Sequence, residues 1–259
     1  MPAPTNLIKS RLQSGDMQLG AWLNLASPVG TEILAGAGYD WCLIDAEHGG
    51  LDTRDVRQGL MALAAVGCPA AVRVAANEGW LLKQVLDLGA QTVLVPMVGS
   101  GAEAQAAADA VRYPPDGARG LAAGVVRASG YGATPDYATS ANAQICLMVQ
   151  AETRAAVDDI DAIAAVEGVD CVFVGPSDLA ADMGYLGDTG AAEVQEAIAH
   201  IMARTRAAGK AVGMFCLNPD DLQRYADLGA RFITVASDVN LLRTAATGRL
   251  AAARASLKS

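Results

Sequence analysis

Four side chains in the sequence are of types that could together bind a divalent cation and a small anion and move a proton. Glu152 and Asp178 each follow a short apolar run, and hard divalent cations such as Mg²⁺ prefer carboxylate ligands. His48 follows another run, in an Asp-x-x-His segment that starts at Asp45, and histidine suits general acid/base catalysis because it titrates near neutrality. Arg73 lies within an apolar run, where a guanidinium must meet a carboxylate of the protein or of a substrate. We expect it to meet the substrate.

Each of these residues also has an ordinary structural interpretation. Acids that follow strands often stabilise the N-terminus of the next helix, and His48 fits equally well as a residue that ties its loop by hydrogen bonds. Adjacent strands lie about 5 Å apart, so Glu152 and Asp178 would repel each other unless a cation or a proton lies between them. We therefore favour a divalent-metal site, in which a bidentate 2-oxo acid completes the coordination.

Eight short apolar runs are predicted to be the strands that position these residues. Each is followed by a loop with Gly, Asp or Pro and then by an Ala/Leu-rich stretch. The predicted strands are residues 20–25, 41–45, 70–74, 92–96, 146–150, 169–174, 211–215 and 232–235. Nearly continuous apolar strands indicate a parallel sheet buried on both faces. We predict a single α/β domain over residues 1–259, a (β/α)8 TIM barrel.

The stretches between the strands carry helix signals, so helices and strands alternate along the chain. The predicted helices are residues 28–34, 53–65, 79–88, 102–111, 154–164, 191–208, 219–228 and 240–253. In (β/α)8 enzymes the active site lies at the carboxyl ends of the strands, where the four charged residues are expected to converge. The long irregular segment 113–143 is interpreted as a lid or a subunit contact, with a plain surface excursion as the alternative.

Composition and charge favour a small-molecule enzyme. The chain has 52% hydrophobic and 18% charged residues and a net charge of -9, which opposes binding to nucleic acid or to anionic membrane surfaces. Residues 1–19 have no positively charged region followed by an apolar stretch, so we expect a cytoplasmic protein. The cysteines form no CxxC pair and indicate reducing conditions; they are Cys42, Cys68, Cys146, Cys171 and Cys216.

Two other kinds of chemistry are not expected. No lysine is placed at the carboxyl end of a predicted strand, which disfavours a Schiff-base aldolase; the lysines are Lys9, Lys83, Lys210 and Lys258. No GxGxxG follows the first strand and there is no P-loop, so no nucleotide cofactor is predicted.

Six separated blocks of the sequence resemble the HpcH/HpaI aldolase family, the metal-dependent class II pyruvate aldolases. The blocks are GAW at 20–22, DAEHG at 45–49, VRYPP and GARG within 111–120, VQAET at 149–153, GPSDL at 175–179 and ADMGY at 181–185. The chain departs from the family pattern in having Ser177 before the second acid and Ala151 before the first. Both changes are small, and the resemblance extends over nearly the whole chain.

The resemblance implies a role for each matching residue. Glu152 and Asp178 would bind Mg²⁺, Mn²⁺ or Co²⁺, His48 assisted by Asp45 would be the acid/base, and Arg73 would stabilise a pyruvate enolate. Other residues would contact the substrate. The part that becomes the 2-oxo acid would be contacted by Gln150, Gly175, Pro176 and Ser177. The part that becomes the aldehyde would be contacted by Trp22, Ser177 and Phe215. Barrel packing is the alternative for the two aromatic residues.

The resemblance also implies an assembly and a reaction. Family members are homo-hexamers, trimers of dimers that exchange the C-terminal helix, and Asp87 matches an acid that reaches a neighbouring subunit's site. The expected reaction is reversible, metal-dependent cleavage of a 4-hydroxy-2-oxo acid or 2-keto-3-deoxy sugar acid to pyruvate, or a related 2-oxo acid, and an aldehyde. The alternatives are a CoA-thioester lyase of the citryl or malyl type and a non-catalytic metabolite-binding scaffold.

Overall fold

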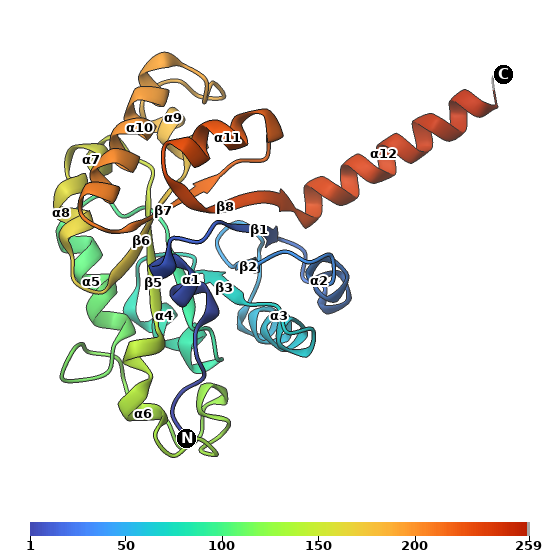
Figure 1. The fold of residues 1–259 in the computed structure, drawn as a ribbon. Coiled ribbons are helices and arrows are strands. Elements are labelled where there is room, and N and C mark those ends of the chain that lie inside the picture. The colour runs from blue at the N-terminus through green and yellow to red at the C-terminus, as the bar shows by residue number, and fades with distance from the viewer. Residues whose placement is uncertain (258–259) are drawn as a thin grey trace.

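Eight parallel strands form a closed barrel in the computed structural model, which describes residues 1–257 (Figure 1). Each strand pairs with the next, and β8 pairs with β1 to close the barrel. The strands are β1 Gln18–Leu23, β2 Trp41–Asp45, β3 Ala70–Arg73, β4 Thr92–Val95, β5 Cys146–Ala151, β6 Val169–Val174, β7 Ala211–Phe215 and β8 Ala230–Ser237. The predicted (β/α)8 fold class is confirmed.

Helices follow the strands and surround the barrel. The first half has α1 Leu7–Ser14, α2 Pro28–Ala35, α3 Thr53–Ala65, α4 Gly79–Asp87 and α5 Gly101–Val111. The second half has α6 Tyr137–Ser140, α7 Arg154–Asp158, α8 Ile160–Ala165, α9 Pro176–Asp182, α10 Ala192–Ala207, α11 Pro219–Asp227 and α12 Asp238–Ser256. Two short 3-10 turns, Arg127–Ser129 and Asn142–Gln144, precede and follow α6.

Some elements differ from the prediction. The predicted helix 154–164 is broken into α7 and α8 at Asp159, whose backbone leaves the helical conformation and whose carboxylate accepts a hydrogen bond from Gly101 N at 2.8 Å. Helices α1 and α9 were not predicted, because α1 precedes the first strand and α9 is a single short helix directly after β6. The strand β8 starts two residues earlier and ends two residues later than predicted.

The core has two layers, as a barrel requires. Aliphatic residues from the outer faces of the strands pack against the helices, while larger side chains fill the barrel interior. At the amino end of the barrel, Trp41 stacks on Phe232 with ring centroids 3.8 Å apart, and Ile8 and Leu12 of α1 belong to the same cluster. The barrel interior is therefore filled at its amino end, and a cavity lies at the carboxyl ends of the strands.

The segment 113–143 lies at the opposite end of the barrel from that cavity. It connects the end of α5 to the start of β5, so it belongs to the amino-end face, and Tyr113 and Tyr137 pack there against Ala3. The interpretation as a lid over this chain's own site is therefore wrong, because a connection from a helix to a strand lies at the face where the strands begin. A subunit contact stays a prediction.

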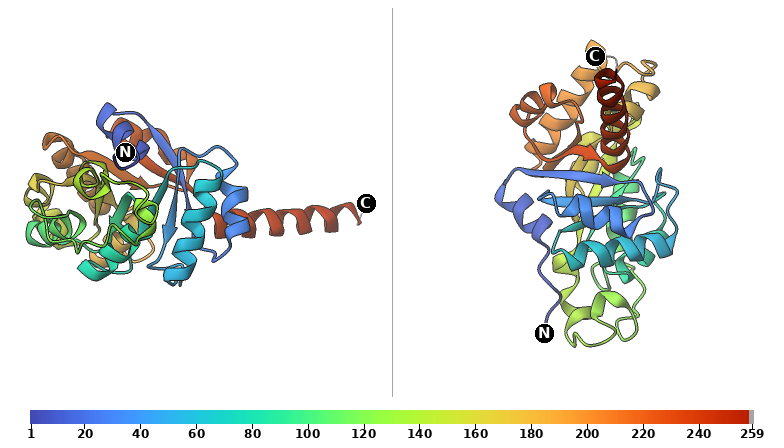
Figure 2. Two further views of the ribbon diagram at one scale, coloured as in Figure 1. Left: turned by 90° about the horizontal axis from the view of Figure 1, so that it is seen from below. Right: turned by 90° about the vertical axis from the view of Figure 1, so that its right-hand side faces the viewer.

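The last helix, α12, leaves the barrel as an isolated rod. The left view in Figure 2 shows it projecting from the body, and none of its residues is buried. It exposes leucines along its length, including Leu242 and Leu250. No helix within residues 1–257 combines the length and the apolar character needed to cross a membrane.

Candidate active site

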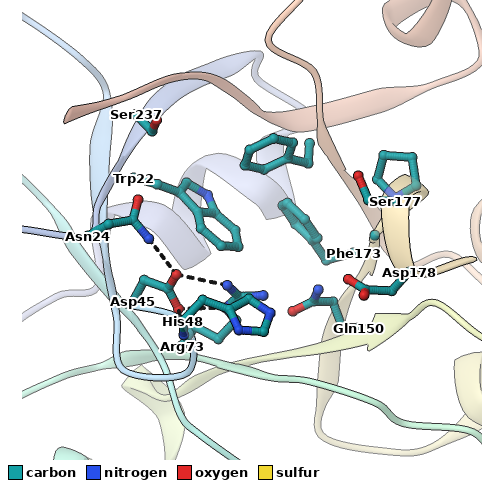
Figure 3. Close-up of a pocket in the computed structure, with 13 residues that line it drawn as sticks. Trp22, Asn24, Asp45, His48, Arg73, Gln150, Phe173, Ser177, Asp178 and Ser237 are labelled. Atoms are coloured by element: carbon teal, nitrogen blue, oxygen red, sulfur yellow. Dashed lines mark hydrogen bonds and ion pairs between the residues drawn. The ribbon is translucent and has the colours of Figure 1, made fainter. Parts of the chain in front are cut away.

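A cavity of about 360 Å³ opens at the carboxyl ends of the strands and collects most of the predicted site residues. Figure 3 shows Asn24, Asp45, His48 and Arg73 on one side and Gln150, Ser177 and Asp178 on the other. Of the other predicted residues, Glu152 adjoins the cavity and Asp87 lies elsewhere. The complete lining is Trp22, Asn24, Asp45, His48, Arg73, Gln150, Phe173, Gly175, Pro176, Ser177, Asp178, Phe215 and Ser237.

Asp45 and Arg73 form a buried, bidentate ion pair, a fork in which two guanidinium N–H groups donate to the two carboxylate oxygens. They are register partners at the ends of β2 and β3, so their side chains leave the sheet side by side. Arg73 donates from Nε to Asp45 Oδ1 and from Nη2 to Asp45 Oδ2, both at 2.9 Å. The side chains are 5% and 1% exposed, which makes this a desolvated fork with fixed geometry.

Arg73 therefore pairs with carboxylates of the protein, the alternative that was not favoured from the sequence, and its contact with substrate stays a prediction. Besides Asp45, its Nη1 lies 2.7 Å from Glu47 Oε2, and its guanidinium carbon lies 4.2 Å from the Trp22 ring centroid. Asp45 takes two of the five N–H groups of the guanidinium, and the Nη1 side faces Glu47. The register between the strands cannot be derived from a local sequence pattern, so this pairing was not predicted.

Asp45 contacts the backbone of His48 rather than its imidazole. Its Oδ1 accepts hydrogen bonds from the backbone N–H groups of Glu47 at 3.2 Å and His48 at 3.3 Å. Together with Arg73 and the Asn24 amide, these donors occupy both carboxylate oxygens. The carboxylate near the ring is Glu47, with Oε2 3.9 Å from His48 Nε2, and the imidazole is 65% exposed. The structure therefore does not bring Asp45 to the ring it was predicted to assist.

Glu152 lies directly after β5, and its carboxylate is held from two sides. Its Oε1 accepts a hydrogen bond from Met97 N at 2.8 Å, and its Oε2 accepts one from Gln150 Nε2 at 2.5 Å. A Cβ at Gly175 would lie 2.3 Å from Glu152 Oε2. The Gly175 turn that carries Asp178 therefore approaches the Glu152 carboxylate closely, and any side chain at this position would displace that carboxylate.

Burial makes Glu152 an unusually weak acid. It is 2% exposed, and desolvation raises its pKa to about 7, with smaller increases from the negative charges of Asp178 and Glu47. Hydrogen bonding from Met97 and the charge of Arg73 lower the pKa by less. Burial also raises the pKa of Glu47, partly opposed by Arg73. The site therefore brings several acids together around one arginine, Arg73, whose charge does not balance theirs.

The two predicted metal ligands suit a hard cation that keeps open positions. Within residues 1–257 no group of three or more His, Cys, Asp or Glu side chains is arranged to enclose an ion. Mg²⁺, however, is often bound by only one or two carboxylates, with water and substrate oxygens in the other positions. Gln150 Oε1 is buried without a hydrogen-bond partner in this part of the chain, so a third oxygen donor lies beside Glu152. The residues present fit such an ion.

Three aromatic side chains form an apolar wall of the cavity. The Trp22 ring centroid lies 5.1 Å from that of Phe215 and 6.1 Å from that of Phe173. Both predicted aldehyde-side aromatic residues are therefore in the lining, together with the exposed Ser177. Phe173 was missed because an aromatic residue inside a buried strand is indistinguishable from core packing in the sequence.

Other residues of the site were also missed. Asn24 follows β1, Ser237 ends β8, and Glu47 lies within the DAEHG block without a predicted role. Asn24 and Ser237 are polar residues at the carboxyl ends of their strands, which is the signal that could have identified them.

Asp87 and the lysines lie away from the cavity. Asp87 ends α4 at the amino-end face, where Arg119 Nη2 donates to it at 2.8 Å. Lys9 and Lys210 donate to backbone carbonyls next to β5 and β6, and Lys83 is exposed on α4. Lys258 lies outside the described residues.

Comparison with known proteins gives one consistent family. The HpcH/HpaI aldolase/citrate lyase family matches residues 18–245. A hydroxypyruvate/pyruvate aldolase of Roseovarius nubinhibens is 51% identical over 97% of this chain and 98% of its own. A 4-hydroxy-2-oxo-heptane-1,7-dioate aldolase of Shigella sonnei is 46% identical over 93% of this chain and 92% of its own. The crystal structure of an HpcH/HpaI aldolase/citrate lyase family protein from Burkholderia cenocepacia has a TM-score of 0.93 and 44% identity, covering 96% of this chain and 100% of its own.

Proposed function

Because the chain belongs to the HpcH/HpaI aldolase/citrate lyase family, we propose that it is a carbon–carbon lyase acting as a class II pyruvate aldolase. The reaction is the reversible aldol cleavage of a 4-hydroxy-2-oxo acid, or of a 2-keto-3-deoxy sugar acid, to a 2-oxo acid and an aldehyde. The 2-oxo acid is pyruvate or a close relative such as hydroxypyruvate, since relatives are named for both.

The observation that carries this proposal is the oriented guanidinium of Arg73 in a cavity that Asp178 lines and Glu152 adjoins. Retro-aldol cleavage leaves an electron pair on the former C3 of the substrate, delocalised onto the 2-oxo oxygen as an enolate. Asp45 fixes one edge of Arg73, so the Nη1 side can donate to an oxygen on which negative charge develops. Donors that are already oriented stabilise such charge without the cost of reorganisation.

Glu152 and Asp178 would hold the divalent ion in this proposal, with Gln150 beside them. A bound Mg²⁺, Mn²⁺ or Co²⁺ supplies Lewis-acid polarisation of the 2-oxo group and charge that balances the two acids. The raised pKa of Glu152 supports this assignment, because a buried acid next to other acids gains most from a nearby cation. The turn at Gly175, Pro176 and Ser177 is proposed to contact the substrate carboxylate.

His48 is proposed to move the proton. It is the one histidine in the cavity lining, and its exposed imidazole can reach a substrate hydroxyl. In the cleavage direction it takes the proton from the 4-hydroxyl group as the C3–C4 bond breaks, which releases the aldehyde. The enolate is then protonated at C3 to give the 2-oxo acid. The aldehyde would lie along the Trp22 and Phe215 wall.

The assembly is proposed from α12 and Asp87. A helix of 19 residues with no buried side chain and several exposed leucines needs an apolar partner, and exchange with a second subunit would provide one. Asp87 lies at the face opposite this chain's own cavity, so it would act at a neighbouring subunit's site. We propose a homo-hexamer, a trimer of dimers, which sedimentation equilibrium would measure directly. The cytoplasm stays the predicted compartment; the five cysteines are unpaired.

The direct test is to follow pyruvate release from a 4-hydroxy-2-oxo acid with a coupled dehydrogenase assay. Release by the wild type and its loss in His48→Ala support the aldolase. Cleavage of malyl-CoA or citryl-CoA with no release from any 4-hydroxy-2-oxo acid would replace the proposal with the thioester lyase. Absence of both reactions would leave the scaffold.

A further inference from the structure

We propose that Asn24 is a positioning residue that holds Arg73 in its working orientation by acting through Asp45. The inference rests on the proposed function, in which Arg73 receives negative charge from the substrate. Asn24 lies just beyond β1, is half-buried, and lines the cavity (Figure 3). It does not need to touch the substrate to affect the reaction.

The backbone of Asn24 is anchored by the first residue of α12. Asp238 accepts the N–H of Asn24 with both carboxylate oxygens, each at 3.0 Å, and the N–H of Leu25 at 2.9 Å. Hydrogen bonds to an ionised carboxylate are stronger than those between neutral groups. The end of β1 is therefore fixed, and the Asn24 side chain projects from a rigid base.

From that base, the Asn24 amide holds one oxygen of Asp45. Asn24 Nδ2 donates to Asp45 Oδ2 at 2.6 Å, and the same oxygen accepts from Arg73 Nη2 at 2.9 Å. Since an ionised carboxylate can only accept hydrogen bonds, the amide nitrogen must be the group that faces it. The other oxygen is held by Arg73 Nε and two backbone N–H groups. Without Asn24, the Oδ2 side would be held by Arg73 alone.

Strand β1 fixes Arg73 in a second way. Trp22, two residues before Asn24, lies on the same side of the strand and stacks on the guanidinium at 4.2 Å. Trp22 thus sets the plane of the guanidinium, while Asn24 and Asp45 set its rotation within that plane. The direction in which the Nη1 side points follows from both contacts together with Glu47 Oε2, which lies 2.7 Å from Nη1.

The test is a double-mutant cycle between Asn24→Leu and Arg73→Lys. Leucine has nearly the same shape as asparagine but cannot donate to Asp45. We expect Asn24→Leu to lower kcat/KM for pyruvate release by about tenfold or more, the scale on which outer partners of a site group act. In the Arg73→Lys background the same change should have an effect of less than about twofold, because a residue that acts through Arg73 adds nothing once the fork is lost.

The matched control is Asn77→Leu. Asn77 is also half-buried on this face of the barrel, where its amide donates to the backbone carbonyl of Glu103 at 3.0 Å, away from Asp45. It should leave kcat/KM within about twofold of the wild type in either background. Equal losses for Asn24→Leu in both backgrounds, or a loss matched by Asn77→Leu, would overturn the proposal.

A readout that needs no turnover separates this proposal from the proposed function. The ¹⁵Nε–¹H resonance of Arg73, assigned by its disappearance in Arg73→Lys, reports the hydrogen bond to Asp45. Asn24→Leu should shift it and speed its exchange with solvent, and Asn77→Leu should not. If the wild type releases no pyruvate, the proposed function fails while this measurement still stands. An unchanged resonance in Asn24→Leu would overturn the positioning role. If Asn24→Leu does not fold, Asp238→Ala, which frees the Asn24 backbone, is expected to give the same shift.

Discussion

Replacing Glu152 by glutamine should stabilise the metal-free protein at alkaline pH, although Glu152 is proposed as a metal ligand. The carboxyl is 2% exposed and its pKa is raised to about 7 from an ordinary value of 4.5, mainly by burial. The folded state therefore binds the proton more tightly than the unfolded state does. Below about pH 4.5 the acid carries no penalty, and stability is lost as the pH rises from there through about pH 7.

The magnitude follows from the difference between the two pKa values. One pKa unit corresponds to about 1.4 kcal/mol, so the ionised carboxylate costs about 1 kcal/mol near pH 5 and about 3 kcal/mol near pH 8. The new amide is uncharged at every pH, and its oxygen can still accept from Met97 N. Its NH2 group can donate to Gln150 Oε1, which lacks a hydrogen-bond partner within residues 1–257. For that contact the Gln150 amide must turn over, so its Nε2 loses the acceptor that it has in the wild type. The substitution should therefore remove the penalty while leaving one Gln150 amide atom unpaired, as in the wild type.

The assay is urea unfolding of chelator-treated wild type and Glu152→Gln across this pH range. The variant should become the more stable of the two by about 3 kcal/mol near pH 8, and added Mg²⁺ should stabilise only the wild type. Glu167→Gln is the control, because Glu167 is exposed and its replacement should give no pH-dependent difference. Equal stability of wild type and Glu152→Gln near pH 8 would refute the reasoning from burial.

Three further changes test other parts of the site. Asp45→Ala should lower the free energy of unfolding by about 3 kcal/mol in urea titrations, because it leaves Arg73 buried with one carboxylate fewer; a loss below about 1 kcal/mol would contradict this. Arg73→Lys should lower kcat for pyruvate release by about 100-fold with little change in melting temperature, since lysine cannot form the fork; a rise in KM alone would contradict the role at the enolate. Met97 has a left-handed backbone with φ 55°, so Met97→Val should destabilise the protein by about 1–2 kcal/mol and Met97→Gly should not, as thermal unfolding would show. Equal effects of the two Met97 variants would mean that the backbone conformation is not strained.

The barrel was predictable because its signals are local and repeated. Six of the eight predicted strands begin at the residue where the observed strand begins, and in four of these a Gly, Pro or charged residue directly precedes the apolar run. The misses have physical causes. The helix 154–164 breaks at Asp159 because that carboxylate bonds to Gly101, a contact distant in sequence. Helix α12 starts two residues earlier than predicted, at Asp238, because Ser237 both ends strand β8 and caps the helix.

The site was predictable in its residue types but not in its pairings. The rule that strand ends meet at one face placed Asp45, Arg73 and Asp178 together, and the cavity contains all three. Whether Asp45 faces His48 or Arg73 depends on the register of β2 against β3, which no local pattern encodes. The role of Asn24 depends on its contact with Asp238, 214 residues away in the chain. Such contacts follow only from closure of the barrel.

The most direct test of the proposed metal-dependent aldolase is pyruvate release by the metal-stripped protein before and after a divalent ion is restored. The protein is treated with chelator, its metal content is checked by elemental analysis, and release from a 4-hydroxy-2-oxo acid is followed with Mg²⁺, Mn²⁺ or Co²⁺. We predict that release is lost on stripping, returns with at least one of these ions, and does not return in Asp178→Ala. Full activity of the stripped wild type would contradict the account.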